Sequence, residues 1–390
     1  MKKVLVITSN ILPVPAVNGG ATEKLVELLI DENEKHKQIC FEVISRYDVN
    51  ASEIAKWYSD TKIHYYYNQL KLKYIFNQLG INLKYAFKRL IGITTLTRYQ
   101  YFILQVISKT KFDFVLVEGG RYEHYVFLKD LKYNTKIIAH VHRNVNTNDL
   151  ALKKYDHIIA VSEHIKRNIV EELGYDNTDV LLNCCDEKKF ISSTAFVSKC
   201  KRNSSYFTIL YVGRLISEKG VLELFDAVHS LNNSNIRVKV SGESLYKNSG
   251  KSKYSEYLHK HELCMEGLVE FLGYVDNSKL QDIMRSCDLC VVPSQFNEPL
   301  SLVPLEAMNA GLPVVLSDAG GLPEWCVEGY PKLARLGRLF TSELSSHIEF
   351  YFYSEAERIA AIQQGLKIAK KHTSENYYNK FISIVNSYEN

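Results

Sequence analysis

Short apolar runs alternate with longer amphipathic stretches along most of the chain. The predicted strands cover residues 4–8, 40–45, 114–117, 136–141 and 156–162 in the first half, and 207–212, 238–242, 269–274, 289–292 and 313–316 in the second. Runs that are apolar almost throughout are typical of parallel strands buried on both faces. The pattern therefore predicts an α/β protein with parallel sheets and intervening helices, such as a helix over residues 21–30.

The chain length adds a domain division to this picture. Its 390 residues are enough for two domains, and 46% apolar with 24% charged residues is a globular composition. We expect domains over residues 1–190 and 206–373, joined by a linker over 191–205 that is rich in Ser, Lys, Arg and Asn. Residues 335–340 resemble the last strand of the second domain. Residues 355–388 are helical by pattern, and their last part has one apolar face, made by Tyr378, Phe381, Ile382 and Val385.

Residues 298–315 place two carboxylates around the expected start of a short helix. Pro304 is allowed in the first turn of this helix, and Gly311 ends it. The free N–H groups and the positive dipole end at such a start favour a phosphate. Glu298 on the loop and Glu306 one turn into the helix can each accept hydrogen bonds from hydroxyl groups. The segment is therefore interpreted as a site for a sugar joined to a diphosphate. The alternative, a pair of solvated surface acids, fits the flanking buried strands less well.

This segment resembles the signature of the retaining GT-B glycosyltransferases of family 4, which use nucleotide sugars. Their pattern reads E-P-F-G-L-x-x-x-E-A-M-A-x-G-x-P-V. The matching residues are Glu298, Pro299, Leu302, Glu306, Ala307, Met308, Gly311, Pro313 and Val314. Leu300 and Ser301 replace Phe and Gly, a change that keeps the backbone N–H groups and alters the sugar pocket. Residues 213–220 resemble a second family pattern, G-R-x-x-x-x-K-G, through Arg214 and Lys219.

The resemblance implies a GT-B fold, in which two Rossmann-like domains face each other across a cleft. A C-terminal helix, about 374–390, would cross back to the N-terminal, acceptor-binding domain. The resemblance also implies that the second domain binds the donor. Glu306 would hold the ribose, Arg214 and Lys219 the diphosphate, and Glu298 the sugar hydroxyls. The other residues expected at the donor are Leu300, Ser301 and Leu302 on the loop, Gly242 in a strand-end turn, and Tyr274, whose turn meets the base.

Two positions in the first domain are further candidates. Gly19 and Gly20 precede the first helix, where glycine lets backbone N–H groups approach an anion. The resemblance implies that this loop faces the donor phosphate, and a plain tight turn is the alternative. His142 follows a strand end, where side chains of a parallel sheet reach the ligand crevice. It matches a family histidine that lies close to the transferred sugar, and His140, two residues earlier, remains an alternative.

Charge is unevenly distributed, although the net charge is only +4. No acidic residue occurs between Asp60 and Asp113, and the bases there include Lys84, Lys88 and Arg89. Bases mixed with Tyr and Leu suit the headgroup level of an anionic bilayer. We therefore expect residues 57–110 to contact a membrane surface, with a helical hairpin packed on the sheet as the alternative. No nucleic-acid-binding signature accompanies the stretch, so no nucleic acid partner is expected.

Metal and redox chemistry find little support in the sequence. The eight cysteines follow no zinc-binding spacing, and the pair Cys287 and Cys290 reads as core thiols in a reducing cytoplasm. No signal peptide and no apolar run of about 18 residues is visible. No D-x-D motif is present to hold a metal. We expect no metal and no cofactor beyond the donor substrate.

Together these features predict a retaining, metal-independent glycosyltransferase that moves a hexosyl or N-acetylhexosaminyl group from a UDP-sugar to a glycan. The basic stretch favours a lipid-linked acceptor, used in capsule, exopolysaccharide or lipopolysaccharide assembly. Such an enzyme is expected in the cytoplasm, peripherally on the inner face of the cell membrane. The alternatives are a non-catalytic partner subunit of the same fold and a sugar-nucleotide epimerase.

Overall fold

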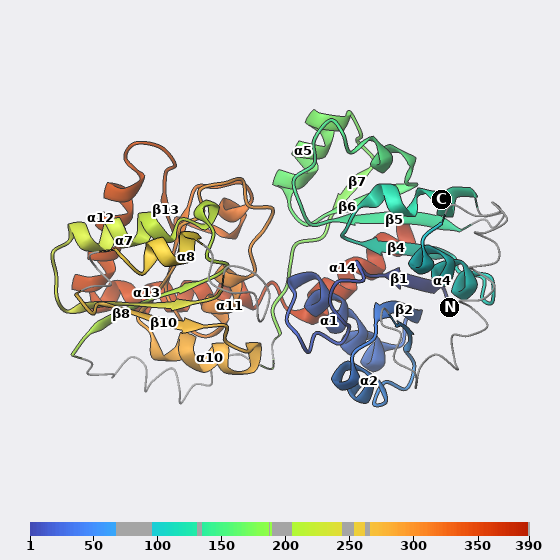
Figure 1. The fold of residues 1–390 in the computed structure, drawn as a ribbon, viewed down its shortest axis with the longest axis horizontal. Helices are drawn as coiled ribbons and strands as arrows, with labels where there is room; N and C mark the ends of the chain where they lie inside the picture. Colours follow the sequence, from blue (N-terminus) through green and yellow to red (C-terminus); the bar gives the residue numbers. More distant parts are fainter. Residues whose placement is uncertain are drawn as a thin grey trace. The chain divides into compact units, whose positions relative to one another are not determined.

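The computed structural model describes residues 1–67, 96–130, 135–186, 188, 205–243, 253–261 and 266–388 (Figure 1). The chain divides into two units. Unit 1 comprises Met1–Val161, Ile165–Leu181 and Tyr377–Asn390, and unit 2 comprises Ser162–His164 and Leu182–Asn376. Unit 1 is therefore discontinuous, because it takes in the last residues of the chain.

Unit 1 is built on a seven-stranded parallel sheet with the order β3-β2-β1-β4-β5-β6-β7. The strands are β1 (Lys3–Ile7), β2 (Cys40–Arg46), β3 (Lys62–Tyr66), β4 (Phe114–Glu118), β5 (Lys136–Val141), β6 (His157–Ala160) and β7 (Thr178–Val180). The helices are α1 (Ala21–His36), α2 (Val49–Ala55), α4 (Arg98–Ile107), α5 (Glu163–Leu173) and α14 (Ser374–Ser387), with 3-10 segments η1 (Tyr122–Asp130) and η2 (Leu150–Lys154). The strand order reverses between β1 and β4, so the loops after these strands flank the switch point where such sheets bind ligands.

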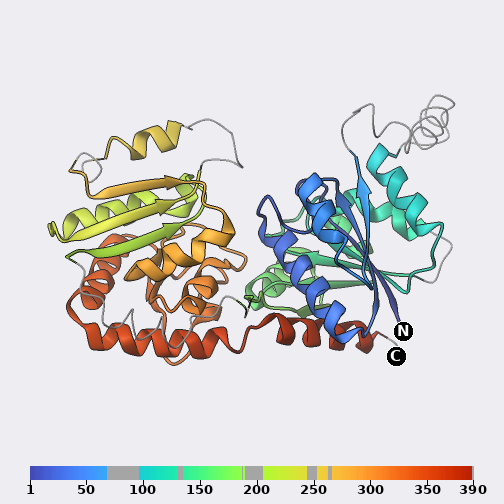
Figure 2. The same ribbon diagram turned by 90° about the horizontal axis from the view of Figure 1, so that it is seen from below.

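The last helix completes the core of unit 1 from the far end of the chain. Figures 1 and 2 show α14 beside α1, and the Tyr378 hydroxyl donates to Oδ1 of Asn33 on α1 at 2.7 Å. Tyr378 and Phe381 are almost completely buried. Lys2 Nζ donates to the carbonyl of Val385 at 2.9 Å, which also ties α14 to the start of β1. The apolar face expected for this segment is thus buried in unit 1.

Unit 2 is built on a six-stranded parallel sheet with the order β10-β9-β8-β11-β12-β13. The strands are β8 (Phe207–Val212), β9 (Ile236–Ser241), β10 (Val269–Gly273), β11 (Leu289–Val292), β12 (Val314–Ser317) and β13 (Lys332–Ala334). The helices are α7 (Val221–Ser230), α8 (Lys253–Leu258), α10 (Asn277–Ser286), α11 (Val303–Asn309), α12 (Phe340–Tyr353) and α13 (Glu355–Ala369), with 3-10 segments η4 (Ser217–Lys219) and η5 (Leu322–Trp325). The order reverses between β8 and β11, which places the loops after these two strands at the switch point of the second sheet.

Two details of the predicted elements are wrong. The closing strand is Lys332–Ala334, and residues 335–340 lead instead into α12. Leu336 and Leu339 in that stretch are exposed, and Gly337 has a φ of 120°, so the apolar pattern there does not mark a buried strand. The helical tail is broken between α13 and α14, because Thr373 forms a β-bridge with Cys185.

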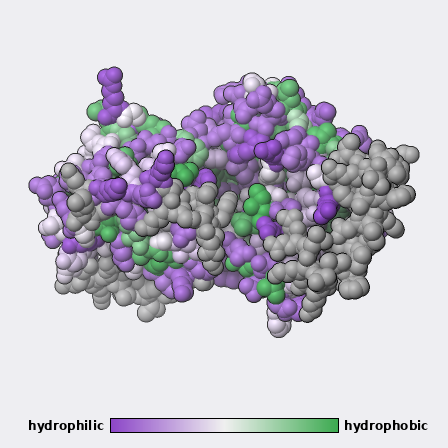
Figure 3. All heavy atoms as spheres, viewed as in Figure 1, coloured by the Kyte–Doolittle hydropathy of each residue, from purple (hydrophilic) through white to green (hydrophobic). Residues whose placement is uncertain are grey.

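The stretch expected to contact a membrane lies largely outside the described residues. Lys84, Lys88 and Arg89 fall in the gap between residues 67 and 96. Two of its described tyrosines form hydrogen bonds within unit 1. Tyr65 donates to the carbonyl of Val14, and Tyr99 donates to that of Thr8. In the described part of the chain, no helix has both the length and the apolar character to cross a membrane. On the face drawn in Figure 3, the described hydrophobic residues form small separate patches within a largely hydrophilic surface.

Candidate functional site

The two loops at the switch point of unit 2 are in direct contact. The N–H of Gln295, after β11, donates to the carbonyl of Glu218, after β8, at 2.8 Å. Gly220 ends the first loop with a φ of 72°, a left-handed conformation that favours glycine. A Cβ atom on Gly220 would lie 1.9 Å from the carbonyl oxygen of Pro293. Glycine at position 220 therefore allows the two loops to approach backbone to backbone.

This contact brings together two of the predicted catalytic side chains. Lys219 Nζ lies 2.5 Å from Oε1 of Glu298, and the same oxygen accepts a 2.6 Å hydrogen bond from the Ser294 hydroxyl. The Glu298 side chain is 5% exposed and that of Lys219 is 19% exposed. The ammonium group also lies 5.0 Å from the centre of the Phe296 ring. The acid is thus buried beside a partly exposed cation.

Arg214 supplies a second cation on the same loop. Its side chain is exposed and forms no hydrogen bond or ion pair within the described residues. Its carbonyl accepts a 2.8 Å hydrogen bond from the buried hydroxyl of Tyr211. Burial raises the pKa of Tyr211, the charge of Glu298 raises it further, and the charge of Arg214 opposes this. Arg214 and Glu298 therefore both lie within electrostatic range of one phenol.

The carbonyl groups of the loop that leads into α11 are held by side chains of unit 2. Ser162 Oγ donates to the carbonyl of Pro299 at 2.7 Å, and Asn183 Nδ2 donates to that of Leu300 at 2.8 Å. In turn, Trp325 Nε1 donates to the carbonyl of Ser301 at 3.0 Å. These three bonds fix the orientation of consecutive peptide groups.

The opposite sides of these peptide groups remain available. Within the part of the chain that the structure describes, the N–H groups of Leu300, Ser301 and Leu302 have no acceptor. They precede α11, whose first turn adds the positive end of a helix dipole. Oriented N–H groups at this place form a fixed donor set for an anion. The loop expected to bind phosphate therefore has the required free donors, with Leu300 and Ser301 in place of the family residues.

The remaining donor-site candidates of unit 2 lie on α11 and at strand ends. Glu306 is half-buried on α11, and its carbonyl accepts a 3.4 Å hydrogen bond from Gln281. Gly242 directly follows β9, and a Cβ atom there would lie 1.8 Å from the carbonyl oxygen of Gly213 after β8. Tyr274 directly follows β10 and is 36% exposed. Arg214, Gly242 and Tyr274 thus share the carboxyl-end edge of the sheet.

In unit 1, the Gly19–Gly20 turn leads directly into α1. Gly20 has a φ of 101°, and a Cβ atom on it would lie 2.2 Å from Oε2 of Glu23. Glu23 is 6% exposed, and the Ser9 hydroxyl donates to its other oxygen at 3.4 Å. Burial raises the pKa of the Glu23 carboxyl. A carboxyl group of the protein therefore lies at the helix start where the sequence predicts a phosphate contact.

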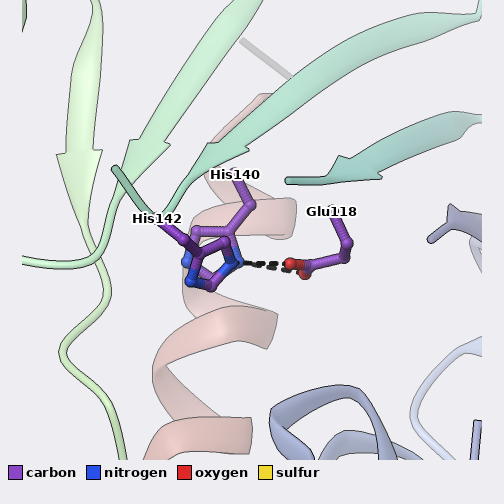
Figure 4. Close-up of side chains that lie close together, drawn as sticks. All are labelled: Glu118, His140 and His142. Carbon is purple, nitrogen blue, oxygen red and sulfur yellow. Dashed lines mark hydrogen bonds and ion pairs between the residues drawn. The ribbon is translucent and has the colours of Figure 1, made fainter. Parts of the chain in front are cut away.

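The histidine candidates of unit 1 share one buried acid (Figure 4). Glu118 ends β4 and is paired in register with His140 on β5. His140 Nδ1 lies 3.0 Å from Oε1 of Glu118, and His142 Nε2 lies 2.8 Å from Oε2. The side chains of Glu118 and His140 are each 1% exposed, whereas that of His142 is 15% exposed. Of the two histidines, only His142 reaches the surface.

The electrostatics of this cluster favour an ionised acid between the rings. Burial by itself raises the pKa of Glu118, but the charges and hydrogen bonds of His140 and His142 lower it to about 2. Burial lowers the pKa of His142, and the neighbouring His140 lowers it further, against the hydrogen bond to Glu118. At neutral pH, Glu118 is therefore a carboxylate and His142 is a neutral imidazole.

The same cluster is the group of described residues whose atoms could hold a metal ion, since its ligand atoms lie within 4.8 Å of one another. Its details fit hydrogen bonding better. The two ring nitrogens face different oxygens of the carboxylate. Nε2 of His140 is buried without a partner among the described residues, whereas a metal-bound histidine normally donates its second N–H to an acceptor.

The predicted site residues thus fall into two sets. Gly19, Gly20, His142 and its alternative His140 belong to unit 1, and the other candidates belong to unit 2. Sequence reasoning missed Glu23, Glu118 and Ser294, which contact the candidates directly. Glu118 carries a visible signal, because it is a carboxylate at the end of an apolar strand, whereas Ser294 carries none.

Comparison with known proteins shows which family and which relatives the chain is similar to. Residues 193–343 match the family described as glycosyl transferases group 1. An uncharacterised glycosyltransferase of Methanocaldococcus jannaschii is 32% identical over 178 residues, which cover 43% of this chain and 43% of that protein. A lipopolysaccharide 1,2-N-acetylglucosaminetransferase of Salmonella typhimurium is 27% identical over 243 residues, which cover 59% of this chain and 62% of that protein. The matched regions therefore span less than two thirds of these relatives.

The fold comparison covers nearly the whole chain. A crystal structure of the Anabaena protein HepE in complex with UDP and glucose superposes with a TM-score of 0.72 at 19% identity. It covers 99% of this chain and 100% of that one. An identity this low carries the fold alone, and it agrees with the two parallel sheets described above. The chain therefore has the GT-B fold, and its residues 193–343 match the glycosyl transferases group 1 family.

Proposed function

We propose that the protein is a glycosyltransferase that moves a sugar from a UDP-sugar to a glycan acceptor. The proposal rests above all on the switch point of unit 2. There, the cations Arg214 and Lys219 and the buried acid Glu298 stand beside a loop with free N–H groups. UDP is favoured as the nucleotide because the structural relative HepE was solved with UDP and glucose.

The chemistry required at this place is stabilisation of a departing diphosphate. Charge builds up on the phosphate oxygens as the bond to the sugar breaks, and fixed donors oppose it without reorganising. Arg214 can bond two phosphate oxygens with its planar fork, and Lys219 adds a point charge. The N–H groups of residues 300–302 add oriented dipoles. In this proposal the reaction needs no metal.

Each carboxylate has a separate role in the proposal. Glu306 binds the ribose hydroxyls, and Glu298 binds hydroxyls of the transferred sugar, because a carboxylate accepts hydrogen bonds from adjacent hydroxyl groups. The reaction proceeds with retention, by attack on the face that the diphosphate leaves. The departing phosphate oxygen takes the proton of the acceptor hydroxyl, so no side-chain general base is assigned.

The acceptor in this proposal is a lipid-linked glycan used to build a cell-surface polysaccharide. The basic interval between Asp60 and Asp113 supports the choice, because cations attract an anionic membrane surface. A relative named as a lipopolysaccharide sugar transferase agrees with it. Replacing Lys84, Lys88 and Arg89 by Gln should release the protein from vesicles of phosphatidylglycerol in a flotation assay. Unchanged flotation would remove the membrane from the proposal.

The donor is tested by presenting the purified chain with a panel of UDP-, GDP- and dTDP-sugars and measuring release of the nucleotide. The expected result is selective turnover of one or more UDP-sugars. Turnover confined to GDP- or dTDP-sugars would overturn the choice of nucleotide. Interconversion of two UDP-sugars without nucleotide release would identify an epimerase. Binding without any turnover, across a range of acceptors, would indicate a non-catalytic subunit.

A further inference from the structure

The buried carboxylate of Glu118 determines which nitrogen of His142 carries the proton. An ionised carboxylate has only acceptor sites, so each ring nitrogen that faces it must be a donor. His142 presents Nε2 to Glu118 at 2.8 Å, and His140 presents Nδ1 at 3.0 Å. A neutral imidazole has one donor and one acceptor nitrogen. In the neutral ring of His142, the lone pair is therefore on Nδ1.

This second nitrogen is accessible to a ligand. Nδ1 of His142 forms no hydrogen bond within the described residues. It is also not one of the unpartnered polar atoms that are buried in that part of the chain. It therefore lies at the surface, in agreement with the 15% exposure of the side chain. The equivalent free nitrogen of His140, Nε2, is buried and cannot meet a ligand.

The cluster lies where a parallel sheet receives its ligand. Glu118 ends β4, and His142 directly follows β5. The loop after β4 borders the switch point between β1 and β4. The Cβ of Ser9, after β1, lies 3.7 Å from the place where a Cβ of Gly120 would stand. The loops after β1 and β4 are thus in contact, and the histidine stands one strand further along the same edge.

We propose that Glu118 is a positioning residue that holds His142 in its Nε2–H form, so that Nδ1 accepts a hydrogen bond from a ligand hydroxyl at this edge. The proposal deepens the proposed function, because a sugar offers such hydroxyl groups. His140 has a supporting place, in which its Nδ1–H saturates the second carboxylate oxygen. Glu118 then cannot turn away from His142 without leaving a buried donor unpaired.

A Gln at position 118 tests this arrangement because it keeps the shape and changes the hydrogen bonding. Its amide offers one acceptor oxygen and one donor nitrogen. One of the two rings must then present a lone pair, and the protonation of the cluster is redistributed. Glu123→Gln is the matched control, since Glu123 lies in the segment that follows β4 and is exposed.

The decisive measurement is nitrogen NMR of the full chain labelled at its 12 histidines. The His142 signals are assigned by their loss in His142→Gln. The expected result at pH 8 is a protonated Nε2 and an unprotonated Nδ1 in the wild type and in Glu123→Gln. Glu118→Gln should show a redistributed pattern at His142 or His140. A wild-type His142 protonated at Nδ1, or a pattern unchanged by Glu118→Gln, would overturn the proposal. A stoichiometric metal found by elemental analysis, with histidine signals that shift on EDTA treatment, would also overturn it.

A kinetic cycle separates positioning from a merely structural role. If Glu118 acts through His142, the double variant that combines Glu118→Gln with His142→Gln should lose no more turnover than His142→Gln alone. Additive losses would show that Glu118 acts independently. The NMR result stands without any turnover, so failure of the glycosyltransferase proposal and failure of the positioning proposal are distinguishable. Melting temperatures of all variants should stay within a few degrees of the wild type. If Glu118→Gln does not fold, the wild-type spectrum still decides which nitrogen is protonated.

Discussion

Lys219 and Glu298 are 79 residues apart in the chain, yet their side chains form an ion pair with 2.5 Å between Nζ and Oε1. The pair joins the loop after β8 to the loop after β11 and neutralises the buried acid. A bound diphosphate would compete with Glu298 for the ammonium group. In the proposed function, the same cation would therefore stabilise the folded protein before a donor binds and the leaving group afterwards.

Lys219→Met should lower both stability and turnover. Among the described residues, it leaves the buried Glu298 carboxylate with Ser294 as its one side-chain hydrogen-bond donor, so we expect unit 2 to lose about 2 kcal/mol of unfolding free energy. Trp325 is fully buried in unit 2, so its fluorescence during urea unfolding measures the loss. Lys239→Met, which breaks the more exposed pair of Lys239 with Glu270, is the control and should cost well under 1 kcal/mol. Equal effects of the two substitutions would contradict a special role for Lys219.

Arg214→Ala should separate catalysis from folding. The side chain is exposed and unpaired within the described residues, so its removal should leave the melting temperature unchanged. Loss of one preformed charge at a developing oxyanion lowers turnover by about 100- to 1,000-fold. Arg237→Ala, at the opposite end of the neighbouring strand β9, is the control and should keep full turnover. Near-normal rates for Arg214→Ala would remove this residue from the site.

Gly220→Ala should disrupt the contact between the two loops of unit 2. The added Cβ would meet the carbonyl oxygen of Pro293 at 1.9 Å, in a backbone conformation that alanine already disfavours. We expect a loss of more than about 2 kcal/mol in unfolding free energy. Gly329→Ala is the matched control, because its φ of 80° is similar and its Cβ would meet open space. Similar losses from both substitutions would show that the backbone conformation alone matters.

The stability of unit 1 should fall as the solution is acidified. The pKa of Glu118 is about 2 in the folded chain against an ordinary value of 4.5, so its contribution is present above about pH 4.5 and is lost towards pH 2. The pKa of His142 is lowered from 6.5, so acidification below that value also disfavours the folded state. Glu23, whose pKa is raised, acts in the opposite sense.

Hydrogen exchange of the β4 and β5 amides, followed from pH 7 down to about pH 2.5, measures this effect. The protection, corrected for the intrinsic pH dependence of exchange, should decrease as the pH falls. Glu118→Gln should flatten this dependence, and Glu123→Gln should leave it unchanged. A wild-type stability that is constant, or that rises with acidification, would contradict the charge assignment of the cluster.

Turnover should survive removal of divalent metals. Fixed cations and N–H groups are expected to stabilise the leaving group, so EDTA should lower the rate by less than about twofold. The measurement is nucleotide release from the accepted UDP-sugar, before and after chelation. An absolute requirement for Mg²⁺ or Mn²⁺ would contradict the proposed role of Arg214 and Lys219.

Much of the fold follows from local patterns in the sequence. Strands such as β1 and β4 are apolar almost throughout because both faces of a parallel sheet are covered, so their runs are easily recognised. The switch-point loops follow from where these runs end. The pattern misled at residues 335–340, where Leu336 and Leu339 are apolar but exposed.

The side-chain arrangement of the site could not be predicted in the same way. Which residues gather around Glu298 depends on a contact between loops 79 residues apart, and no local period encodes it. Ser162 stands directly before α5, and its hydroxyl also donates to the carbonyl of Pro299, a contact that no local spacing predicts. Sequence spacing could not decide which histidine is accessible to a ligand, because His140 and His142 lie two residues apart on the same face. Their exposed fractions, 1% and 15%, distinguish them.

The discontinuity of unit 1 has a consequence for biosynthesis. Its sheet is complete once residue 181 has left the ribosome, but Tyr378 and Phe381 of its core are made only after the whole of unit 2. Domains fold as they emerge where their sequence permits it. The unit that is encoded first would therefore be finished after the one encoded second, and a premature stop near residue 376 would damage the beginning of the chain rather than its end.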